Sequence, residues 1–339
     1  MEESLRVGVI GYGYWGPNLT RNFFEIPSSE VVAIVDKKKE QLERAMQKYP
    51  RVTLVDDYRE LFSMGLDAVV ISTPPKTHFP IAFECLSNNL HVLVEKPLAL
   101  NSEDAEALIK RAKTNNLTLM VGHTFEYNSA VKALKEYIQT GELGDIYYLD
   151  TARLNLGLYQ RDTNVLWDLA VHDISILLNL LSEKPVSVSA QGMTSVSKDI
   201  CDVAYLNIIF PNNIIAHVHV SWLDPCKVRR VTVVGSKKMA VFNDLESEGK
   251  IKLYDKGVDA PAYTDGFGEF QYNYRSGDIT IPSFRFVEPL REECQHFLDS
   301  IINKTEPVSS GQSGLAVIKV LEAAERSIKN NGHQETIAW

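Results

Sequence analysis

Three glycines follow directly behind a short apolar run near the start of the chain, and their spacing limits what this segment can fold into. The run Val7–Ile10 predicts a buried β-strand, and Gly11, Gly13 and Gly16 stand at its end in G-x-G-x-x-G spacing. At a turn from a strand into a helix, the first glycine makes the tight turn. The second lets the backbone approach a pyrophosphate, and the third lets the helix pack closely on the strand. Because the N-terminal N–H groups of that helix face the anion, the segment predicts a dinucleotide-binding turn that also includes Tyr14 and Trp15.

An acidic residue completes the pattern expected of such a turn. A second apolar run, Val31–Val35, predicts the next strand and leads into Asp36, which lies 20 residues beyond Gly16. A carboxylate at this separation accepts hydrogen bonds from the ribose of an adenosine. It also repels a 2′-phosphate, so Asp36 favours NAD over NADP, although Lys37 and Lys38 could offset that repulsion. The alternative is a glycine turn in another kind of α/β protein.

Length and composition bound the class of protein. The 339 residues exceed what one hydrophobic core usually serves, so we expect two domains, residues 1–122 and 123–339. Hydrophobic residues make up 45% and charged residues 23%, as in an ordinary globular protein. The net charge of -9 and the absence of a Lys/Arg cluster argue against a nucleic-acid partner.

The cysteines and the apolar runs indicate the compartment. Cys85, Cys201, Cys226 and Cys294 form no C-x-x-C pair, which predicts reduced thiols rather than disulfide bonds or a zinc site. Arg6 interrupts the N-terminal segment, so we expect no secretory signal. No apolar run approaches the roughly 18 residues of a membrane span. The sequence therefore predicts a cytoplasmic protein without a membrane partner.

Up to about residue 122, strand-like runs alternate with segments of helical periodicity. This alternation predicts an N-terminal doubly wound α/β fold, a parallel sheet with helices on both faces. The expected strands are Val7–Ile10, Val31–Val35, Ala68–Ser72, Val92–Val94 and Leu117–Val121. Ligands bind at the carboxyl ends of such strands. We therefore expect four motifs to gather along one edge of the sheet: Gly11, Asp36, Thr73–Pro75 and Glu95–Pro97.

Beyond Gly122 consecutive strands replace the alternation, which predicts a C-terminal α+β domain on an open, mostly antiparallel sheet. The expected strands are Ile146–Leu154, Val186–Ala190, Val203–Phe210, Ile214–Trp222, Val228–Val234, Met239–Phe242 and Ile251–Tyr254. Helices are expected over Ser129–Gln139, Leu169–Leu181, 290–301 and 312–329. Pro211–Asn213 predicts a hairpin connection. The segment 256–285 is rich in Gly, Tyr and Asp and predicts a long loop.

Lys96 stands directly after a predicted buried strand, in the sequence Glu95-Lys96-Pro97. A charged side chain is costly at such a place unless it is used or paired. A lysine there can donate to a substrate oxygen and stabilise the negative charge that develops as hydride leaves carbon. The alternative is a lysine at a strand end that simply reaches solvent.

Asp168 and His172 are four residues apart, so on a helix both side chains would project from one face. An imidazole is suited to accept a hydroxyl proton near neutral pH, and a neighbouring carboxylate can orient it or raise its basicity. The alternative is a core histidine with a capping aspartate. His217 and His219 alternate on one strand without a third ligand nearby, which predicts packed sheet histidines and no metal site.

Together these motifs strongly resemble those of the Gfo/Idh/MocA oxidoreductases over nearly the full chain. The matching motifs are Gly11–Gly16, Asp36, Thr73–His78, Glu95–Pro97, Gly122-His123 and Asp168 with His172. The resemblance implies that Lys96 is the catalytic lysine, beside a cis peptide to Pro97, with Asp168 and His172 as partners. It also implies a set of residues on the nicotinamide side of the cofactor cleft, namely Thr73, Pro74, His78, Glu95 and Lys96.

Within the family, the chain most resembles the branch that acts on nucleotide-activated sugars such as UDP-N-acetylglucosamine. This implies an NAD-dependent dehydrogenase in which His172 accepts the proton of a ring hydroxyl and Lys96 stabilises the oxygen. Besides these two, the candidate substrate contacts are Tyr127, Asn128, Arg153, Tyr159 and Arg161. Each of these could equally be an ordinary loop residue.

Two other functions are compatible with the same motifs. A dehydrogenase of free polyols or inositols would not need cationic groups for a diphosphate, and the same residues could also reduce a keto-sugar. A cofactor-binding regulator without turnover would not need both Lys96 and His172. The family resemblance further implies a homodimer or homotetramer formed through the C-terminal sheet.

Overall fold

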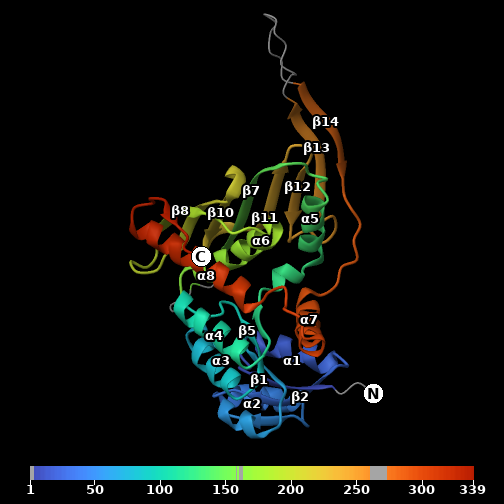
Figure 1. Ribbon diagram of the computed structural model, residues 1–339, viewed down its shortest axis with the longest axis vertical. Coiled ribbons are helices and arrows are strands. Elements are labelled where there is room, and N and C mark those ends of the chain that lie inside the picture. The colour runs from blue at the N-terminus through green and yellow to red at the C-terminus, as the bar shows by residue number, and fades with distance from the viewer. Residues whose placement is uncertain (1–3, 158, 160–162, 260–272) are drawn as a thin grey trace, which may run out of the picture. The chain divides into compact units, whose positions relative to one another are not determined.

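The computed structural model describes residues 4–157, 159, 163–259 and 273–339. These residues form two compact units, each with a sheet of its own (Figure 1). The first unit comprises the chain up to Tyr127 together with Val287–Lys319. The second unit comprises Asn128–Phe286 together with Val320–Trp339.

The first unit is built on a six-stranded sheet in the order β3-β2-β1-β4-β5-β6. The strands are β1 (Leu5–Ile10), β2 (Ser29–Val35), β3 (Thr53–Val55), β4 (Ala68–Ile71), β5 (His91–Glu95) and β6 (Leu119–Gly122). All neighbours pair in parallel, which confirms the predicted N-terminal fold. Sequence analysis missed β3, because three partly exposed residues form no apolar run.

Helices connect these strands. They are α1 (Gly16–Glu25), α2 (Lys39–Lys48), α3 (His78–Ser87) and α4 (Ser102–Thr114), with 3₁₀ helices η1 (Tyr58–Ser63), η2 (Pro75–Thr77) and η3 (Thr124–Tyr127). The side chain of Asn101 caps α4 by accepting a hydrogen bond from the Asp104 N–H at 2.8 Å. Acidic residues in its first turn and basic residues in its last turn match the helix dipole.

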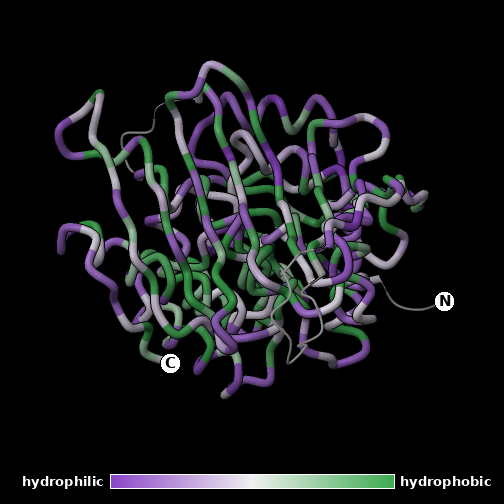
Figure 2. Tube along the Cα trace, turned by 90° about the horizontal axis from the view of Figure 1, so that it is seen from above, coloured by the Kyte–Doolittle hydropathy of each residue, from purple (hydrophilic) through white to green (hydrophobic). Residues whose placement is uncertain are grey.

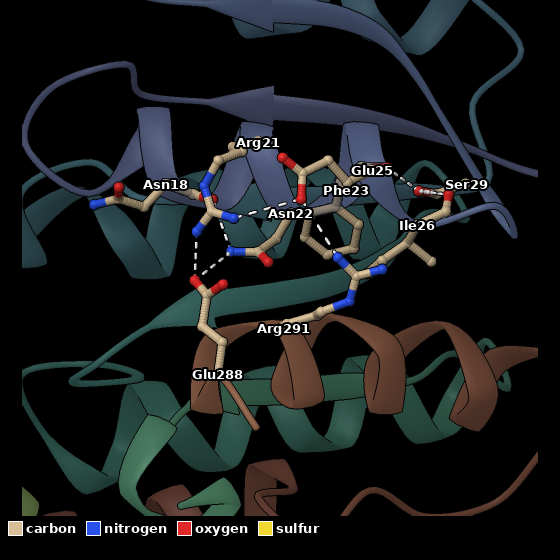
Figure 3. Close-up of polar contacts among 9 residues, drawn as sticks. All are labelled: Asn18, Arg21, Asn22, Phe23, Glu25, Ile26, Ser29, Glu288 and Arg291. Atoms are coloured by element: carbon tan, nitrogen blue, oxygen red, sulfur yellow. Dashed lines mark hydrogen bonds and ion pairs between the residues drawn. The ribbon is translucent and has the colours of Figure 1, made fainter. Parts of the chain in front are cut away.

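Helix α7 (Pro289–Asn303), late in the chain, packs on α1 within the first unit. The rings of Phe23 and Phe297 meet edge to face, with centroids 6.3 Å apart, inside the core of this unit. Figure 3 shows the polar side of the contact, where Arg21 donates to Glu288. Arg291 lies 3.3 Å from a carboxylate oxygen of Glu25. An apolar face and a row of ion pairs therefore hold α7 on α1.

The compact units differ from the two continuous ranges expected from the sequence, 1–122 and 123–339. Residues 123–127 and 287–319 belong to the first unit, although the chain passes through most of the second unit between them. Sequence periodicity shows that α7 has an apolar face, but the partner of that face is α1, more than 260 residues earlier. The segment α8 (Gly311–Lys329) contributes residues to both units.

The second unit contains a nine-stranded sheet in the order β14-β13-β12-β11-β7-β10-β9-β8-β15. The strands are β7 (Ile146–Leu156), β8 (Ser187–Met193), β9 (Val203–Ile209), β10 (Ile215–Ser221), β11 (Leu223–Gly235), β12 (Met239–Asn243), β13 (Ile251–Asp259), β14 (Asn273–Thr280) and β15 (Glu335–Thr336). Only the central pair β7 and β10 is parallel among these described strands, so the sheet is mostly antiparallel as predicted.

The structure corrects the prediction that 256–285 is a loop. Strand β13 continues to Asp259, and Asn273–Thr280 forms β14, which pairs with it. Nearly every residue of β14 is exposed, so the strand carries no apolar alternation that a sequence could reveal. Its backbone pairing with β13 defines it instead.

Helices α5 (Ser129–Gln139) and α6 (Val171–Leu181) contact each other and the sheet of the second unit. Buried and exposed side chains alternate along strands such as β9, and Figure 2 shows hydrophobic and hydrophilic residues interleaved along this sheet. On the face pointing away from the core, the Tyr205 ring stacks on His219, with centroids 4.3 Å apart. The Nδ1 atom of His217 lies 2.9 Å from Asn207 Oδ1. Both histidines are therefore held by neighbours in the sheet.

Candidate active site

The turn between β1 and α1 leaves no room for a side chain at two of its three glycines. Gly11 adopts a φ of +95°, in the left-handed region that favours glycine. A Cβ atom on Gly16 would lie 2.1 Å from the carbonyl oxygen of Gly11. Around Gly13, by contrast, no described residue beyond its chain neighbours lies within 4 Å of a Cβ position. The turn itself requires Gly11 and Gly16, whereas Gly13 faces open space that a pyrophosphate can approach.

Tyr14 and Trp15 form the last part of this turn. Their rings are nearly parallel, with centroids 6.1 Å apart, and Tyr14 is 92% exposed. The carbonyl oxygen of Trp15 accepts the N–H groups of Asn18 and Leu19, which begins α1. Tyr14 is thus accessible to a ligand, and Trp15 is the residue on which the helix starts.

Asp36 lies at the end of β2, beside the glycine turn. Its Oδ2 accepts the backbone N–H of Tyr12 at 2.7 Å, and its Oδ1 accepts that of Lys38 at 2.8 Å. These two bonds fix the plane of the carboxylate at the edge where a dinucleotide presents its adenosine ribose. The residues present therefore fit NAD, and the pyrophosphate at Gly13 and the ribose hydroxyls at Asp36 stay predicted places for its groups.

His78 joins the segments that follow β4 and β5. Its Nε2 lies 2.8 Å from the carbonyl oxygen of Thr73, and its Nδ1 lies 2.7 Å from that of Pro97. The ring is 1% exposed, and this burial lowers the pKa of His78, while the two carbonyl contacts oppose that shift. A protonated ring would donate to both carbonyls and a neutral ring to only one. His78 therefore connects two loops of the predicted cofactor cleft, and the Lys96–Pro97 peptide is cis, as predicted.

Two carboxyl groups, Glu95 and Glu293, are buried in the first unit, and Glu95 directly precedes Lys96. Glu95 is 8% exposed, and burial raises its pKa to about 8, although the charge of Lys96 lowers it. Glu293 on α7 is fully buried, and burial together with the charge of Glu95 raises its pKa well above the ordinary value. Burial and the Lys96 charge lower the pKa of His123 to about 3. Lys96 thus stands beside Glu95, which tends to stay protonated, and close enough to His123 to help keep that ring neutral, while Glu293 interacts with Glu95.

Sequence analysis missed Glu293, although a signal was present. The expected helix 290–301 places Leu290, Cys294 and Phe297 on its apolar face, and Glu293 lies on that same face. A carboxyl group in the middle of an apolar stripe is costly unless something compensates for it. That position was therefore a reason to suspect a specific buried role.

In the second unit, Asp168 lies in a single π-helical turn, Leu166–Ala170, directly before α6. The Val171 N–H donates to the Leu166 carbonyl five residues earlier, which widens the helix at this point. Sequence analysis predicted an ordinary α-helix from Leu169, since hydrophobic periodicity does not distinguish one wide turn. Such π turns occur frequently at functional sites.

Side chains from distant segments hold this turn in place. The Trp222 indole N–H donates to Asp168 Oδ2 at 3.0 Å. Glu325 on α8 accepts both the Asn164 side-chain amide and the Trp167 indole N–H at 2.9 Å. His172 follows in the first turn of α6 and is partly exposed. The predicted proton acceptor and its carboxylate partner are therefore on one rigid segment.

Three predicted substrate contacts are buried and bonded within the protein. Arg153 is 5% exposed and forms a two-point ion pair with Asp173, at 2.8 and 3.2 Å. The Tyr127 hydroxyl lies 2.9 Å from Ser309 Oγ, and Asn128 Oδ1 accepts the Ala130 N–H and caps α5. These bonds hold the three side chains within the fold, and their contact with a substrate stays a prediction.

The other two predicted contacts differ from these. Tyr159 is partly exposed, its ring lies edge-on to Trp222 with centroids 5.2 Å apart, and its hydroxyl donates to Asp202 at 3.4 Å. Arg161 lies outside the described residues. Lys96 belongs to the first unit, whereas Asp168 and His172 belong to the second, so their joint action stays a prediction.

The chain matches two family models and resembles known dehydrogenases. Residues 5–123 match the oxidoreductase family with an NAD-binding Rossmann fold, and residues 131–241 match the GFO/IDH/MocA C-terminal domain. The UDP-N-acetylglucosamine 3-dehydrogenase of Acidithiobacillus ferrooxidans is 28% identical over 260 residues, 75% of this chain and 78% of that protein. The myo-inositol 2-dehydrogenase of Thermotoga maritima is 24% identical over 336 residues, 96% of each chain.

Solved structures show the same fold. The match to the UDP-N-acetylglucosamine 3-dehydrogenase GnnA from A. ferrooxidans spans 97% of this chain and 99% of the GnnA chain, with a TM-score of 0.79 at 25% identity. An oxidoreductase from Agrobacterium radiobacter, solved in complex with NAD+, covers 98% of both chains with a TM-score of 0.80 at 19% identity. The second likeness concerns the fold alone.

Among the helices in the described part of the chain, none combines the length and apolar character needed to cross a bilayer. Within the same ranges, no group of three or more His, Cys, Asp or Glu side chains could hold a metal ion. All four cysteines are free thiols, as predicted. From its two matching domains and its glycine turn, the chain belongs to the Gfo/Idh/MocA family of NAD-binding oxidoreductases.

Proposed function

We propose that this enzyme oxidises a ring hydroxyl of a UDP-sugar such as UDP-N-acetylglucosamine, at C3, or reduces the corresponding ketone. As a member of this family it is an oxidoreductase that acts on a CH–OH group with NAD. The observation that carries the proposal is the rigid segment holding Asp168 and His172, in a chain that resembles GnnA over almost its full length. That enzyme is named for oxidation of UDP-N-acetylglucosamine.

NAD, when bound, supplies the hydride acceptor at its nicotinamide ring. The proposed roles of the chain's own residues follow from their chemistry. His172 accepts the proton of the substrate hydroxyl as a general base, and Asp168 orients the imidazole. Lys96 donates to the same oxygen and stabilises the charge that develops on it. In the reducing direction, the protonated His172 returns the proton to the oxygen.

The diphosphate of a UDP-sugar needs cationic partners on a chain of net charge -9. Of the two arginines predicted for this role, Arg153 is engaged by Asp173, so the proposal now depends on Arg161. Removing a charge-assisted contact of this kind costs about 1.5–3 kcal/mol. Arg161→Ala should therefore raise the KM for UDP-N-acetylglucosamine at least about tenfold and change kcat less.

A second candidate is a dehydrogenase of a free polyol such as an inositol. The Arg153–Asp173 pair favours it, because the pair removes one predicted phosphate contact. The full-length similarity to a myo-inositol 2-dehydrogenase agrees with it. Turnover of UDP-sugars compared with turnover of inositols separates the two candidates.

The deciding experiment measures absorbance of the reduced nicotinamide with UDP-N-acetylglucosamine, other UDP-sugars, free sugars and inositols. Turnover confined to UDP-sugars supports the first candidate, and equal or better turnover of inositols rejects it. Tight NAD binding without turnover of any compound would favour a cofactor-binding regulator instead. Titration with both cofactors tests Asp36, since equal or tighter binding of NADP would contradict its proposed role.

We also propose that copies of the chain associate through the outward face of the nine-stranded sheet. That face carries exposed Tyr148, Tyr205 and Ile215 beside the two sheet histidines. Light scattering at several protein concentrations tests this, and a monomer at every concentration would reject it. We propose, separately, that the protein is cytoplasmic.

A further inference from the structure

One contact in the second unit that the proposed function leaves unassigned is made by Trp222, between β10 and β11. Its side chain is 2% exposed, and its indole N–H donates to Asp168 Oδ2 at 3.0 Å. An indole nitrogen can only donate, so in a buried position it needs an acceptor. A carboxylate is the stronger kind of acceptor for such a donor.

The backbone of Trp222 is fixed from both sides. Its N–H donates to the Asp202 carbonyl at 2.9 Å, and its carbonyl accepts the Gly157 N–H at 3.1 Å. Asp202 is fully buried, and its carboxylate accepts the backbone N–H groups of Ser195 and Val196 at 2.8 and 2.9 Å. The indole is therefore a rigid donor whose position depends on three other segments.

The turn that carries Asp168 is held separately. The Asn164 side chain accepts the N–H groups of Leu166 and Trp167, and Glu325 accepts a bond from both Asn164 and Trp167. These contacts fix the backbone of the turn without involving the Asp168 carboxylate. The Trp222 indole N–H holds one oxygen of that carboxylate and so restricts its rotation about its own side-chain bond.

We propose that Trp222 is a positioning residue for Asp168, holding one carboxylate oxygen so that the other keeps a single orientation toward the His172 side of the helix. This inference rests on the proposed function, in which Asp168 orients the general base. A carboxylate that rotates freely would orient the imidazole in only a fraction of the molecules. A group of this kind affects turnover without touching substrate or cofactor.

The test compares Trp222→Phe with Trp339→Phe. Both variants keep an aromatic ring and lose an indole N–H that donates to an oxygen atom, the Asp168 carboxylate in the first and the Pro185 carbonyl in the second. Only the first loses the contact to Asp168. We expect Trp222→Phe to lower kcat by about ten- to a hundredfold, the scale of a hydrogen bond to a charged group. The KM and the Kd for NAD should change by less than about twofold, and Trp339→Phe should keep near-normal kcat.

A double-mutant cycle with Asp168→Ala distinguishes positioning from general destabilisation. Once the carboxylate is absent, Trp222→Phe should reduce kcat no further, and the shifts in unfolding temperature should not add. Additive effects in both measurements, or equal kcat in the two tryptophan variants, would overturn the inference.

The thermal part of the cycle needs no substrate. Normal turnover of Asp168→Ala would reject the proposed role of Asp168, and the positioning role would fall with it. If the unfolding temperatures of the variants still show coupling between Trp222 and Asp168 in that case, the contact is present and the proposed function is what fails. Absent coupling together with an inactive Asp168→Ala would instead reject Trp222 alone.

Discussion

The turn at Gly11–Gly16 and the turn at Leu166–Ala170 are held in opposite ways. The first turn requires glycine, which has no side chain, because a Cβ on Gly16 would lie 2.1 Å from the Gly11 carbonyl oxygen. The second depends on side chains that are present, from segments 54 and up to 161 residues away. The comparison shows that a backbone turn fails when an atom is added, whereas a clamped turn fails when a hydrogen-bonding group is removed.

Adding one methyl group should break the first turn. Gly16→Ala should destabilise the protein by at least about 3 kcal/mol or prevent folding, because backbone atoms are in the way and cannot relax cheaply. Gly13→Ala is the matched control, since its Cβ would enter open space. It should unfold near the wild-type temperature and lose NAD affinity on the order of tenfold or more. Normal stability of Gly16→Ala in thermal unfolding would show that the turn can relax.

Removing one charged side chain should destabilise the second unit. Arg153→Ala leaves Asp173 buried without its ion-pair partner, although burial already raises the Asp173 pKa. We expect a loss of about 3–5 kcal/mol in denaturant unfolding. The control is Arg230→Ala, whose pair with Asp150 is 4.0 Å long and largely exposed, and it should cost less than about 1 kcal/mol. Equal losses would mean that the buried pair contributes nothing specific.

The proposed chemistry can be removed without disturbing either turn. Lys96→Ala and His172→Ala should each reduce turnover on the order of a hundredfold, while the Kd for NAD and the unfolding temperature change little. His333→Ala, at an exposed site outside both turns, serves as the control. A variant that retained near-normal turnover would assign its residue a structural role.

A smaller effect should appear as a dependence of stability on pH. Burial raises the pKa of Glu293 in the folded protein, so the folded state holds a proton that the unfolded chain releases above its ordinary pKa of 4.5. Wild-type stability therefore falls as pH rises from that value toward the raised pKa. Glu293→Gln should gain relative stability over this window by up to about 1.4 kcal/mol per pH unit.

The control for this titration is Glu292→Gln, at a partly exposed position one residue earlier on α7. Its stability relative to the wild type should not change with pH in the same way. Denaturant unfolding at several pH values between 4.5 and 8 measures both variants. A pH-independent difference for Glu293→Gln would show that Glu293 is charged in the folded protein.

Most strands and helices could be predicted because their periodicity is local. The expected range Ser129–Gln139 coincides with α5, and five of the six parallel strands were expected within a few residues. The exceptions were β3, β14 and β15, which are short or exposed and depend on pairing with a neighbour. The π turn was also missed, since one extra residue per turn leaves the apolar pattern almost unchanged.

The candidate site likewise combines features that short motifs predicted and contacts that they did not. The cis peptide before Pro97 is as the family resemblance implies, and Asp36 lies at the end of β2 beside the glycine turn, as the strand pattern predicted. The substrate contacts could not be predicted to the same degree. Position after a strand does not show whether Arg153 faces a ligand or the carboxylate of Asp173.

By itself, the sequence determined the glycine turn, the parallel sheet and the place of Lys96 at the end of β5. These features depend on allowed backbone angles and on the period of apolar residues, which are properties of short segments. Only the tertiary structure decided that Trp222 bonds Asp168 and that Glu293 is buried near Glu95. The reason is that a polar side chain takes its partner and loses its water through contact with segments far away in the chain. Neither the partner nor the degree of burial is encoded within one motif.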